Sequence, residues 1–431
     1  MKYSLRHAKQ QNIANETYGY VGDLGFKASV PATPILVRSR RLHAERNRRR
    51  TPPPHPVGPP GPGVPHHFVV KVHSRCNLAC HYCYVYRSPD TSWRTRPRAL
   101  SSPVTHHLSR RLVEHGERHR LSDIAVTLHG GEPLLVGHRR LDAIAGTLRR
   151  AFHRSPTALH LSVQTNGVLL DTAFLEILAR HRVAVGVSLD GDAEAHDRYR
   201  RHASGRGSHR QVGEALALLN RPRFRGLYGG LLCRVDLAND PVRTYEALRA
   251  HAPPMVDFLL PHATWDRPPP GTSPARAPYA DWLIEAFDHW HARAQRPRVR
   301  TFDSLVRLVQ GEASLTEDLG EPPSPVLVVE TDGAIELHDS LKIAYEGAGA
   351  TGLNVSEHGF DRVRPTGDSP CSTCVDCPLF GVCGGGMRAH RHRADSGFAN
   401  PSVYCRDLQK LIRHVDRRVG SNSTPARPTE H

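Results

Sequence analysis

The sequence predicts an α/β fold, an open barrel of six strand and helix units followed by a smaller α+β module. Short apolar segments alternate with amphipathic helical segments from residue 67 to about residue 295, a pattern typical of repeated parallel strand-helix units. Beyond that point the sequence changes to a predicted hairpin and a group of cysteines. A chain of 431 residues is also too long for one compact core, so at least two folded units are expected.

The strands are predicted from short runs of apolar residues, and the helices from the amphipathic segments that follow them. Strands are expected at 68–73, 123–129, 159–164, 183–189, 227–233 and 256–260. Helices are expected near 105–119, 137–153, 171–181, 209–220, 241–251 and 278–293. Six units indicate a partial (β/α)6 TIM-type barrel over residues 67–295, in which the carboxyl ends of the strands share one rim.

Residues 296–418 are predicted to form the second module. A helical stretch (302–311) leads to "PVLVVETDGAIELHDSLK", which reads as two short strands joined at Asp332-Gly333, a strong local signal for a hairpin. A helix is expected at about 405–417, and residues 419–431 are expected to be a flexible tail.

The N-terminal segment, residues 1–66, is expected to be a disordered basic arm. It holds eleven Lys and Arg against three Asp and Glu, which is half of the formal net charge of +16, and it ends in a stretch dense in Pro, Gly and Arg. Such a composition cannot bury a core. Elsewhere the basic residues are not interleaved with aromatic ones, so no specific nucleic-acid partner is expected.

The expected location is the cytoplasm, without a membrane partner. No apolar run reaches the length that spans a bilayer, and the first residues lack the layout of a secretory signal. In that reducing compartment, clustered cysteines are metal ligands or catalytic groups more often than disulfide partners. Eight of the nine cysteines lie in two clusters, whereas Cys233 stands alone and is expected to be a buried apolar residue.

The first cluster follows the first predicted strand and contains Cys76, Cys80 and Cys83. Three thiolates can hold a small iron-sulfur cluster and leave one iron without a protein ligand. A structural zinc site prefers four ligands, and His73 or His81 could complete one, so zinc remains an alternative from the local sequence.

Three further motifs follow the next three predicted strands: "HGGEP" (129–133), "QTNG" (164–167) and "SLDG" (188–191). Because the carboxyl ends of parallel barrel strands open onto one rim, these motifs and the cysteine loop are expected to face the same site. Independent surface turns would not be expected to align in this way.

The stretch "CNLACHYC" resembles the cluster loop of the radical S-adenosylmethionine (SAM) superfamily, with Tyr82 at its aromatic position. The resemblance implies a [4Fe-4S] cluster on Cys76, Cys80 and Cys83 whose open iron binds SAM. It further implies reductive cleavage of SAM to a 5′-deoxyadenosyl radical that abstracts hydrogen from an unactivated carbon. An electron donor is implied as a partner.

The same resemblance implies the residues that bind SAM. Gly130, Gly131, Glu132 and Pro133 resemble the motif that meets the SAM amine, Ser188 resembles the ribose contact, and Asn166 and Asp190 shape the rim. Arg210 is taken as the partner of the SAM carboxylate, with Arg198 and Arg200 as competitors.

The second cluster contains Cys374, Cys377, Cys383 and Cys405, with Cys371 as a spare thiol or an alternative ligand. Taken alone, a zinc ribbon would explain the four equally well. Their spacing is similar to that of the outer auxiliary cluster in SPASM domains, C-terminal modules that carry extra iron-sulfur clusters. The SPASM pattern has further cysteines where this chain has Met387 and His338, so one auxiliary [4Fe-4S] cluster is expected.

Longer phrases, among them "DFLLPHATWDRPPP" and "NPSVYC", resemble the FxsB-type radical SAM/SPASM peptide maturases from about residue 67 to 418. That likeness implies a ribosomally made precursor peptide as substrate and a cyclophane crosslink between an aromatic ring carbon and a nearby β-carbon. The auxiliary cluster would accept the last electron. Asp339, Asp332 and Glu336 are the candidate proton acceptors, with Asp339 preferred; ordinary solvation of a turn and a strand is the alternative for each.

Two other kinds of function stay open from the sequence. The first is another SPASM peptide modification, either a thioether crosslink or a formylglycine-type oxidation. The second is a zinc protein that binds nucleic acid through its basic arm, although this would leave the ordered rim motifs unexplained.

Overall fold

A computed structural model describes residues 63–420, except residues 274, 321–324 and 365–369. The chain divides into two units, 1–56 and 57–431, and the second contains every described residue. The predicted disorder of residues 1–66 and the predicted flexibility of residues 419–431 therefore concern segments that lie almost entirely outside the described residues. Both stay predictions.

Six neighbouring parallel strands form the barrel part of the sheet, which confirms the predicted fold class. Each observed strand starts and ends within one residue of its predicted range. They are β1 (His67–His73), β2 (Asp123–Gly130), β3 (Ala158–Thr165), β4 (Val183–Ser188), β5 (Tyr228–Arg234) and β6 (Met255–Leu259).

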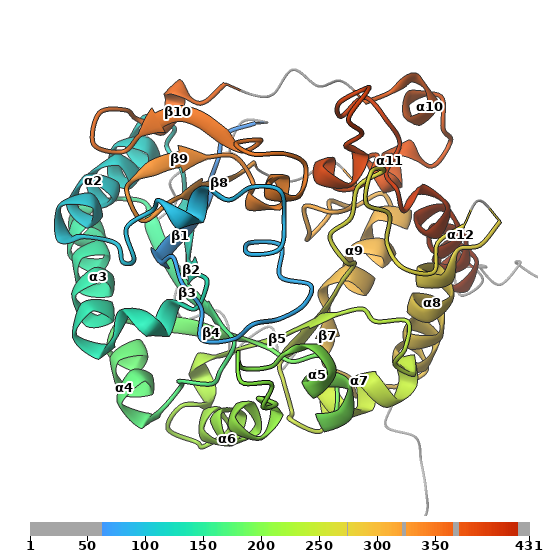
Figure 1. Ribbon diagram of the computed structural model, residues 1–431, viewed down its shortest axis with the longest axis horizontal. Coiled ribbons are helices and arrows are strands. Elements are labelled where there is room, and N and C mark those ends of the chain that lie inside the picture. Colours follow the sequence, from blue (N-terminus) through green and yellow to red (C-terminus); the bar gives the residue numbers. More distant parts are fainter. Residues whose placement is uncertain (1–62, 274, 321–324, 365–369, 421–431) are drawn as a thin grey trace, which may run out of the picture. The chain divides into compact units, whose positions relative to one another are not determined.

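The predicted helices lie on the outer side of the curved sheet (Figure 1). They are α2 (Ser102–Arg118), α3 (His138–Ala151), α4 (Thr172–Arg180), α6 (His209–Leu219), α7 (Pro241–Arg249) and α8 (Pro278–His291), with the unpredicted short helix α5 (Ala193–Tyr199) before α6. Ser101, Asp171 and Asp240 accept hydrogen bonds from the first turns of α2, α4 and α7, as N-cap residues do. Short 3₁₀ helices η1 (Ser92–Arg94), η2 (Pro133–Val136), η3 (Phe152–Arg154) and η4 (Arg225–Leu227) complete the connections.

The two faces of the barrel strands differ in chemistry. Ile124, Val126 and Leu128 of β2 are buried in the main apolar core. Intervening positions carry polar side chains that bond across neighbouring strands: His67 Nε2 to Thr127 Oγ1 at 3.0 Å, and Gln164 Nε2 to Ser188 Oγ at 3.1 Å. Because side chains alternate along a strand, these polar groups occupy the face opposite to the core. The inside of the barrel is therefore suited to a polar ligand.

The sheet continues into the C-terminal part of the chain, which the local sequence pattern did not predict. β7 (Arg298–Val299) pairs with β6 at one end and is followed by α9 (Arg300–Val309). At the other end β8 (Val326–Val329) pairs in parallel with β1, and β9 (Ala334–Glu336) and β10 (Ala350–Asn354) follow. The predicted hairpin at Asp332-Gly333 is thus confirmed as β8–β9. One continuous sheet contains strands from both sides of the predicted boundary between residues 295 and 296. The two predicted modules are therefore packed together through this sheet.

The remaining segments carry the second cysteine group (Figure 1). They are η5 (Asp339–Ile343), η6 (Phe360–Arg362), α10 (Ser372–Val375), α11 (Phe380–Cys383), η7 (Arg388–Arg391) and α12 (Cys405–Gly420). Helix α12 runs three residues past its predicted end and packs on α8 and α9. Across the described residues, no helix has the length and apolar composition needed to cross a bilayer.

Candidate active site

The first cysteine cluster lies in a loop that leaves the carboxyl end of β1. The ladder between β1 and β2 shifts register between Lys71 and His73, just before this loop. The loop is held by a backbone hydrogen bond from Ala79 N to Arg201 O at 2.7 Å and by Leu78 N, which donates to Cys76 Sγ at 3.4 Å. This loop therefore supplies three thiols, those of Cys76, Cys80 and Cys83, and contains no fourth cysteine.

The thiols of this loop are partly buried and interact electrostatically with one another. Burial raises the pKa of Cys76 to about 12 and that of Cys80 to about 11. As thiolates they would need a positive partner, which an iron-sulfur cluster supplies. The donor set therefore fits a cluster held by three cysteines, as predicted.

Gly130 and Gly131 let the end of β2 approach the start of the cysteine loop closely. Gly131 N donates to His73 O at 2.9 Å, and Glu132 N donates to Arg75 O at 3.0 Å. A Cβ added at Gly131 would lie 1.9 Å from the Tyr86 hydroxyl and 2.6 Å from the Arg75 carbonyl oxygen. Only glycine fits there, so the motif is not an ordinary surface turn.

The Glu132 carboxylate is completely buried and already has three donors. It accepts hydrogen bonds from Leu134 N at 3.0 Å, from Thr165 Oγ1 at 2.6 Å and from Asn166 N at 2.8 Å. Burial raises its pKa to about 7 despite these donors. The carboxylate holds η2, which begins at Pro133, against the end of β3, and this leaves the backbone of the motif for the predicted contact with the SAM amine.

Asn166 and Ser188 lie at the ends of β3 and β4, as predicted. Asn166 Nδ2 donates to Asn77 Oδ1 at 2.8 Å and lies 3.7 Å from Cys76 Sγ, so this side chain joins the third rim motif to the cysteine loop. Ser188 Oγ accepts from Gln164 Nε2 on the inner face of the sheet. The motifs after the first three strands therefore meet at one rim, and the fourth motif supplies Asp190 to the same rim.

Tyr82 and Asp190 belong to a cluster of polar and charged residues that lies beside the cysteine loop. The Tyr82 hydroxyl donates to Asp190 Oδ2, and Arg200 Nε donates to the same oxygen at 2.9 Å. Arg234 N donates to Asp190 Oδ1 at 3.1 Å, and its guanidinium lies 4.4 Å from the centre of the Tyr82 ring. Burial opposes ionisation of Asp190, yet Arg200 holds its pKa below the usual value.

The prediction that places Arg210 at the SAM carboxylate is not supported by the structure. The Arg210 side chain is 80% exposed and pairs with Glu214 one turn along α6. Arg198 is engaged by Asp236 and Asn239. Arg200, by contrast, is 14% exposed and interacts electrostatically with Cys80. Arg200 is the C-cap residue of α5, where the helix ends, and sequence spacing does not reveal the direction of its side chain.

Asp339 is buried at the start of η5 and faces the inner end of β1. It pairs with Lys71 and accepts a hydrogen bond from the Tyr84 hydroxyl at 2.8 Å, while Lys71 Nζ also lies 3.0 Å from His129 Nδ1. Burial alone would raise the pKa of Asp339, but Lys71 and His129 hold it well below its usual range. The carboxylate is therefore ionised and lies between the second module and the barrel.

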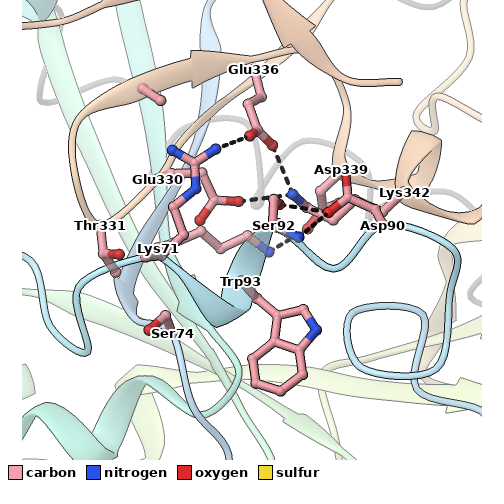
Figure 2. A network of polar contacts seen from close by, with 12 residues as sticks. Lys71, Ser74, Asp90, Ser92, Trp93, Glu330, Thr331, Glu336, Asp339 and Lys342 are labelled. Carbon is pink, nitrogen blue, oxygen red and sulfur yellow. Dashed lines mark hydrogen bonds and ion pairs between the residues drawn. The ribbon is translucent and has the colours of Figure 1, made fainter. Parts of the chain in front are cut away.

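The other two predicted carboxylates belong to a neighbouring network of ion pairs, and Figure 2 shows the part of it around Glu336. Arg96 pairs with Asp332 and, at 2.5 Å, with Glu336. Lys342 lies 2.8 Å from Glu336 and 3.1 Å from Glu330, and Figure 2 shows it between these two carboxylates. Through Arg96, Asp332 and Glu336 connect the β8–β9 hairpin to the segment before α2. These ion pairs stabilise the packing of the hairpin.

Sequence reasoning missed Lys71, His129 and Tyr84, which surround Asp339 together with His262. The His262 ring lies 4.6 Å from that of Tyr84, and its Nδ1 is buried without a hydrogen-bond partner in the described part of the chain. One signal was available for Lys71, because a lysine within the apolar strand "FVVKVH" is costly to bury unless it is paired.

The second cysteine group is brought together by α10, α11 and the start of α12. Cys374 interacts with Cys371, Cys405 and Cys383, and Cys383 interacts in turn with Cys377. Burial raises the pKa of Cys374 to about 12 and that of Cys383 to about 11. Cys371 thus lies within the group and not apart from it. All five thiols are available to one metal cluster.

The positions at which the SPASM pattern has further cysteines hold no ligand set. Met387 packs on a small apolar cluster that includes Leu341, Ile343 and Phe398. His338 Nδ1 lies 2.7 Å from Ser340 Oγ, and its Nε2 lies 3.7 Å from Glu317. Apolar packing and ion pairs thus fill the region around η5.

Residues 70–233, which contain the cysteine loop and the rim motifs, match the Radical SAM superfamily. This match assigns residues 70–233 to the Radical SAM superfamily. The matched region ends within β5, so the C-terminal part is characterised by its relatives and by its own geometry.

The relatives include enzymes that mature sulfatases. A cysteine-type anaerobic sulfatase-maturating enzyme of Clostridium perfringens is 22% identical over 362 residues, which cover 80% of this chain and 95% of that protein. A serine-type enzyme of Bacteroides thetaiotaomicron is 32% identical over 156 residues, 36% of each protein.

Solved structures share the fold. The structure of native anSMEcpe with bound AdoMet has a TM-score of 0.70 at 20% identity and covers 83% of this chain and 100% of that chain. Streptococcus suis SuiB bound to precursor peptide SuiA has a TM-score of 0.52 at 13% identity, covering 80% of this chain and 76% of that chain. Both the barrel and the C-terminal part therefore have counterparts in this class.

Proposed function

We propose that the chain is a peptide maturase that uses SAM at Cys76, Cys80 and Cys83 to modify a ribosomally made precursor peptide. The main support for this proposal is that the cysteine loop and the three rim motifs lie together at the carboxyl ends of β1 to β4. Each of these motifs resembles one that binds the cluster or SAM in the radical SAM superfamily. The names of the relatives support a peptide substrate, since they include sulfatase-maturating enzymes and SuiB with its precursor peptide.

The residues around the loop divide the task of binding SAM. Bound at a [4Fe-4S] cluster, SAM supplies a 5′-deoxyadenosyl radical that abstracts a hydrogen atom from the peptide. The backbone of Gly130 and Gly131 offers polar groups near the cysteines. Arg200 would bind the SAM carboxylate through its two terminal guanidinium nitrogens. Among the described residues, Asp190 accepts a hydrogen bond from the third guanidinium nitrogen, Nε, and not from these two.

The reaction that we propose is a cyclophane crosslink between an aromatic ring carbon and the β-carbon of a nearby residue. After the β-carbon radical adds to the ring, the ring must lose one electron and one proton to become aromatic again. The oxidised ring is a strong acid, so a weak base such as the ionised Asp339 is sufficient to take its proton. Asp339 is preferred because it contacts Lys71 within the barrel strand β1, whereas Asp332 and Glu336 pair with Arg96 in the segment before α2.

The electron is assigned to one auxiliary [4Fe-4S] cluster held by Cys374, Cys377, Cys383 and Cys405. Cys371 interacts with Cys374 and is the alternative ligand. A second auxiliary cluster has no ligands near η5, where Met387 and His338 make other contacts. An external electron donor is required to reduce the cluster that cleaves SAM.

A formylglycine-type oxidation is the second candidate, and the names of the sulfatase-maturating relatives favour it. It would use the same SAM site and the same auxiliary cluster. Its product is an aldehyde, whereas a cyclophane contains no new carbonyl group. A thioether crosslink differs from both because it consumes a cysteine.

A zinc protein is less consistent with the geometry. At a Zn–S distance of about 2.3 Å, the sulfurs of a tetrahedral site lie about 3.8 Å apart. Within the described residues, no three cysteine sulfurs lie within 4.8 Å of one another. The thiols are therefore more widely spaced than a zinc site requires.

The test incubates the reconstituted enzyme with SAM, a reductant and one of two synthetic peptides, a peptide with a Phe-X-Ser motif and a cysteine-containing sulfatase peptide. We expect the first to lose two hydrogens, with fragmentation blocked between the joined residues and no reaction with a hydrazide. A hydrazide-reactive product from the sulfatase peptide alone would replace the cyclophane with formylglycine formation. Cleavage of SAM with neither peptide modified would contradict both assignments.

A further inference from the structure

Two histidines and an aspartate meet on the outer side of the barrel, outside the site described above. His115 lies in the last turn of α2, His119 is the C-cap residue of that helix four positions later, and Asp361 belongs to η6. One ligand atom from each lies within 4.8 Å of the others. Among the described residues, this is the one group of three such side chains at that spacing.

The tautomer of His115 is fixed by its second nitrogen. Nε2 lies 2.7 Å from the carbonyl oxygen of Pro65, which can only accept, so Nε2 carries the proton. In the neutral ring Nδ1 then carries a lone pair. The His115 side chain is 2% exposed, so packing fixes its position beside Asp361. A backbone carbonyl on the far nitrogen is also the usual arrangement behind a metal-binding histidine.

The lone pair of His115 Nδ1 faces a carboxylate oxygen. Within the described part of the chain Nδ1 has no hydrogen-bond partner, and it lies 3.4 Å from Asp361 Oδ1. His119 Nε2 contacts the same oxygen. The lone pairs of His115 Nδ1 and Asp361 Oδ1 repel each other at this separation unless a cation lies between them. His119 can share a proton with Asp361 Oδ1, but this proton does not lie between Oδ1 and His115 Nδ1.

The other oxygen of the carboxylate contacts an arginine, which leaves most of the carboxylate charge uncompensated. Arg118 Nη1 lies 2.7 Å from Asp361 Oδ2, but the Arg118 side chain is 68% exposed and its contribution is correspondingly small. Oδ1 therefore remains for a ligand. A cavity of about 320 Å³ opens onto these residues, and Glu114, Glu357 and His358 also line it. It gives a hydrated ion a path to the site and a place for further ligands.

We propose that His115, His119 and Asp361 bind one divalent transition-metal ion. Two imidazoles and one carboxylate suit Zn²⁺, Ni²⁺ or Co²⁺, whereas Mg²⁺ and Ca²⁺ prefer sites made only of oxygen. Histidines four residues apart on a helix present both rings to one ion. On binding, the proton shared by His119 and Asp361 passes to solvent, and water fills the open position.

The site would be structural. His115 bonds to Pro65, just before β1, whereas the cysteine loop leaves the other end of that strand. In α/β barrels the reaction takes place at the carboxyl ends of the strands, and the opposite ends serve stability. An ion here would join the entry of β1, helix α2 and η6. It would thereby anchor the segment that leads to the second cysteine group.

The experiment titrates Ni²⁺ into the holoenzyme, with both clusters loaded so that the cysteines do not compete. Wild type is expected to bind one ion more tightly than all others, and the melting temperature should rise on binding. His119→Gln and Asp361→Asn should each weaken that site at least about tenfold and abolish the rise. Circular dichroism checks that both variants are folded.

The matched control is His138→Gln. His138 Nε2 lies 3.2 Å from Asp171 and so forms a histidine-aspartate pair on another helix, without a second imidazole. This variant should bind Ni²⁺ as wild type does. Equal loss in the control, unchanged binding in folded His119→Gln and Asp361→Asn, or the lack of a tight ion in wild type would each overturn the proposal.

Discussion

Asp339 combines ionisation with burial, and the chemistry of the proposed reaction depends on it. Its carboxylate is paired with Lys71 and hydrogen-bonded by Tyr84, so it has a fixed position on the inner face. Asp339→Asn should therefore retain SAM cleavage but lose crosslinked product, because the amide cannot accept the ring proton. Leaving Lys71 unpaired should also lower the free energy of unfolding by about 3–5 kcal/mol.

The control for this change is Asp332→Asn, since Asp332 lies in the hairpin turn and its side chain is 36% exposed. Deoxyadenosine release and peptide crosslinking are measured on the same samples. The assignment fails if Asp339→Asn forms product at the wild-type rate, or if Asp332→Asn loses the product while Asp339→Asn does not.

Arg200 should determine how tightly SAM binds. A hydrogen bond to a charged group contributes about 1.5–3 kcal/mol, so Arg200→Gln should raise the Kd for SAM roughly tenfold to a hundredfold. The exposed Arg210 should tolerate the same change. Calorimetric titration of SAM into reconstituted protein measures both. A weaker affinity in Arg210→Gln, with Arg200→Gln unchanged, would restore the assignment made from the sequence.

At the scale of elements, the turn from β2 into η2 determines whether the cysteine loop can close. Gly131→Ala would place a methyl group against the Tyr86 hydroxyl and the Arg75 carbonyl, so the loop would have to move. We expect the iron bound at the first cluster to fall to a small fraction of the wild-type amount.

Gly213→Ala is the matched control for this turn. Gly213 lies within α6, and an added Cβ there would have open space. Alanine should stabilise the helix by about 0.5–1 kcal/mol. Iron analysis and melting temperature separate the two glycines. Full iron loading in Gly131→Ala would show that the close approach is not needed.

The contact between η2 and β3 should depend on pH through Glu132. Its pKa rises from 4.5 to about 7 on folding because the carboxyl is buried. The stabilisation linked to its proton is therefore complete below about pH 4.5 and is lost as the pH rises through about 7. Wild type should lose stability relative to Glu132→Gln between about pH 4.5 and pH 7, and the difference should stay constant above that range. Parallel melting curves of the two proteins across that range would contradict this.

At the scale of the whole molecule, local periodicity predicted the barrel strands to within one residue, because each strand carries its own apolar pattern. It could not predict that β8 pairs with β1, since this contact joins residues 326–329 to residues 67–70 and has no local signal. The same limit applies to the choice between Arg210 and Arg200. The direction of a side chain at the end of a helix depends on packing, which places Arg200, and not the exposed Arg210, beside Cys80.

The pairing of β8 with β1 makes the two predicted modules one structure around the candidate site. Asp339 follows the hairpin, yet it contacts Lys71 within the first barrel strand. The sequence motifs were sufficient to predict that the cysteine loop and the rim motifs meet, because each follows a predicted strand. The candidate site combines residues from both parts of the chain, and only the assembled sheet brings them together.

The central claim is that three cysteines at the end of β1 support cleavage of SAM. The most direct measurement is the release of 5′-deoxyadenosine and methionine from SAM by the anaerobically reconstituted, reduced protein. We predict release by wild type and none by the variant in which Cys76, Cys80 and Cys83 are all alanine. No release by wild type, or equal release by the variant, would contradict the account.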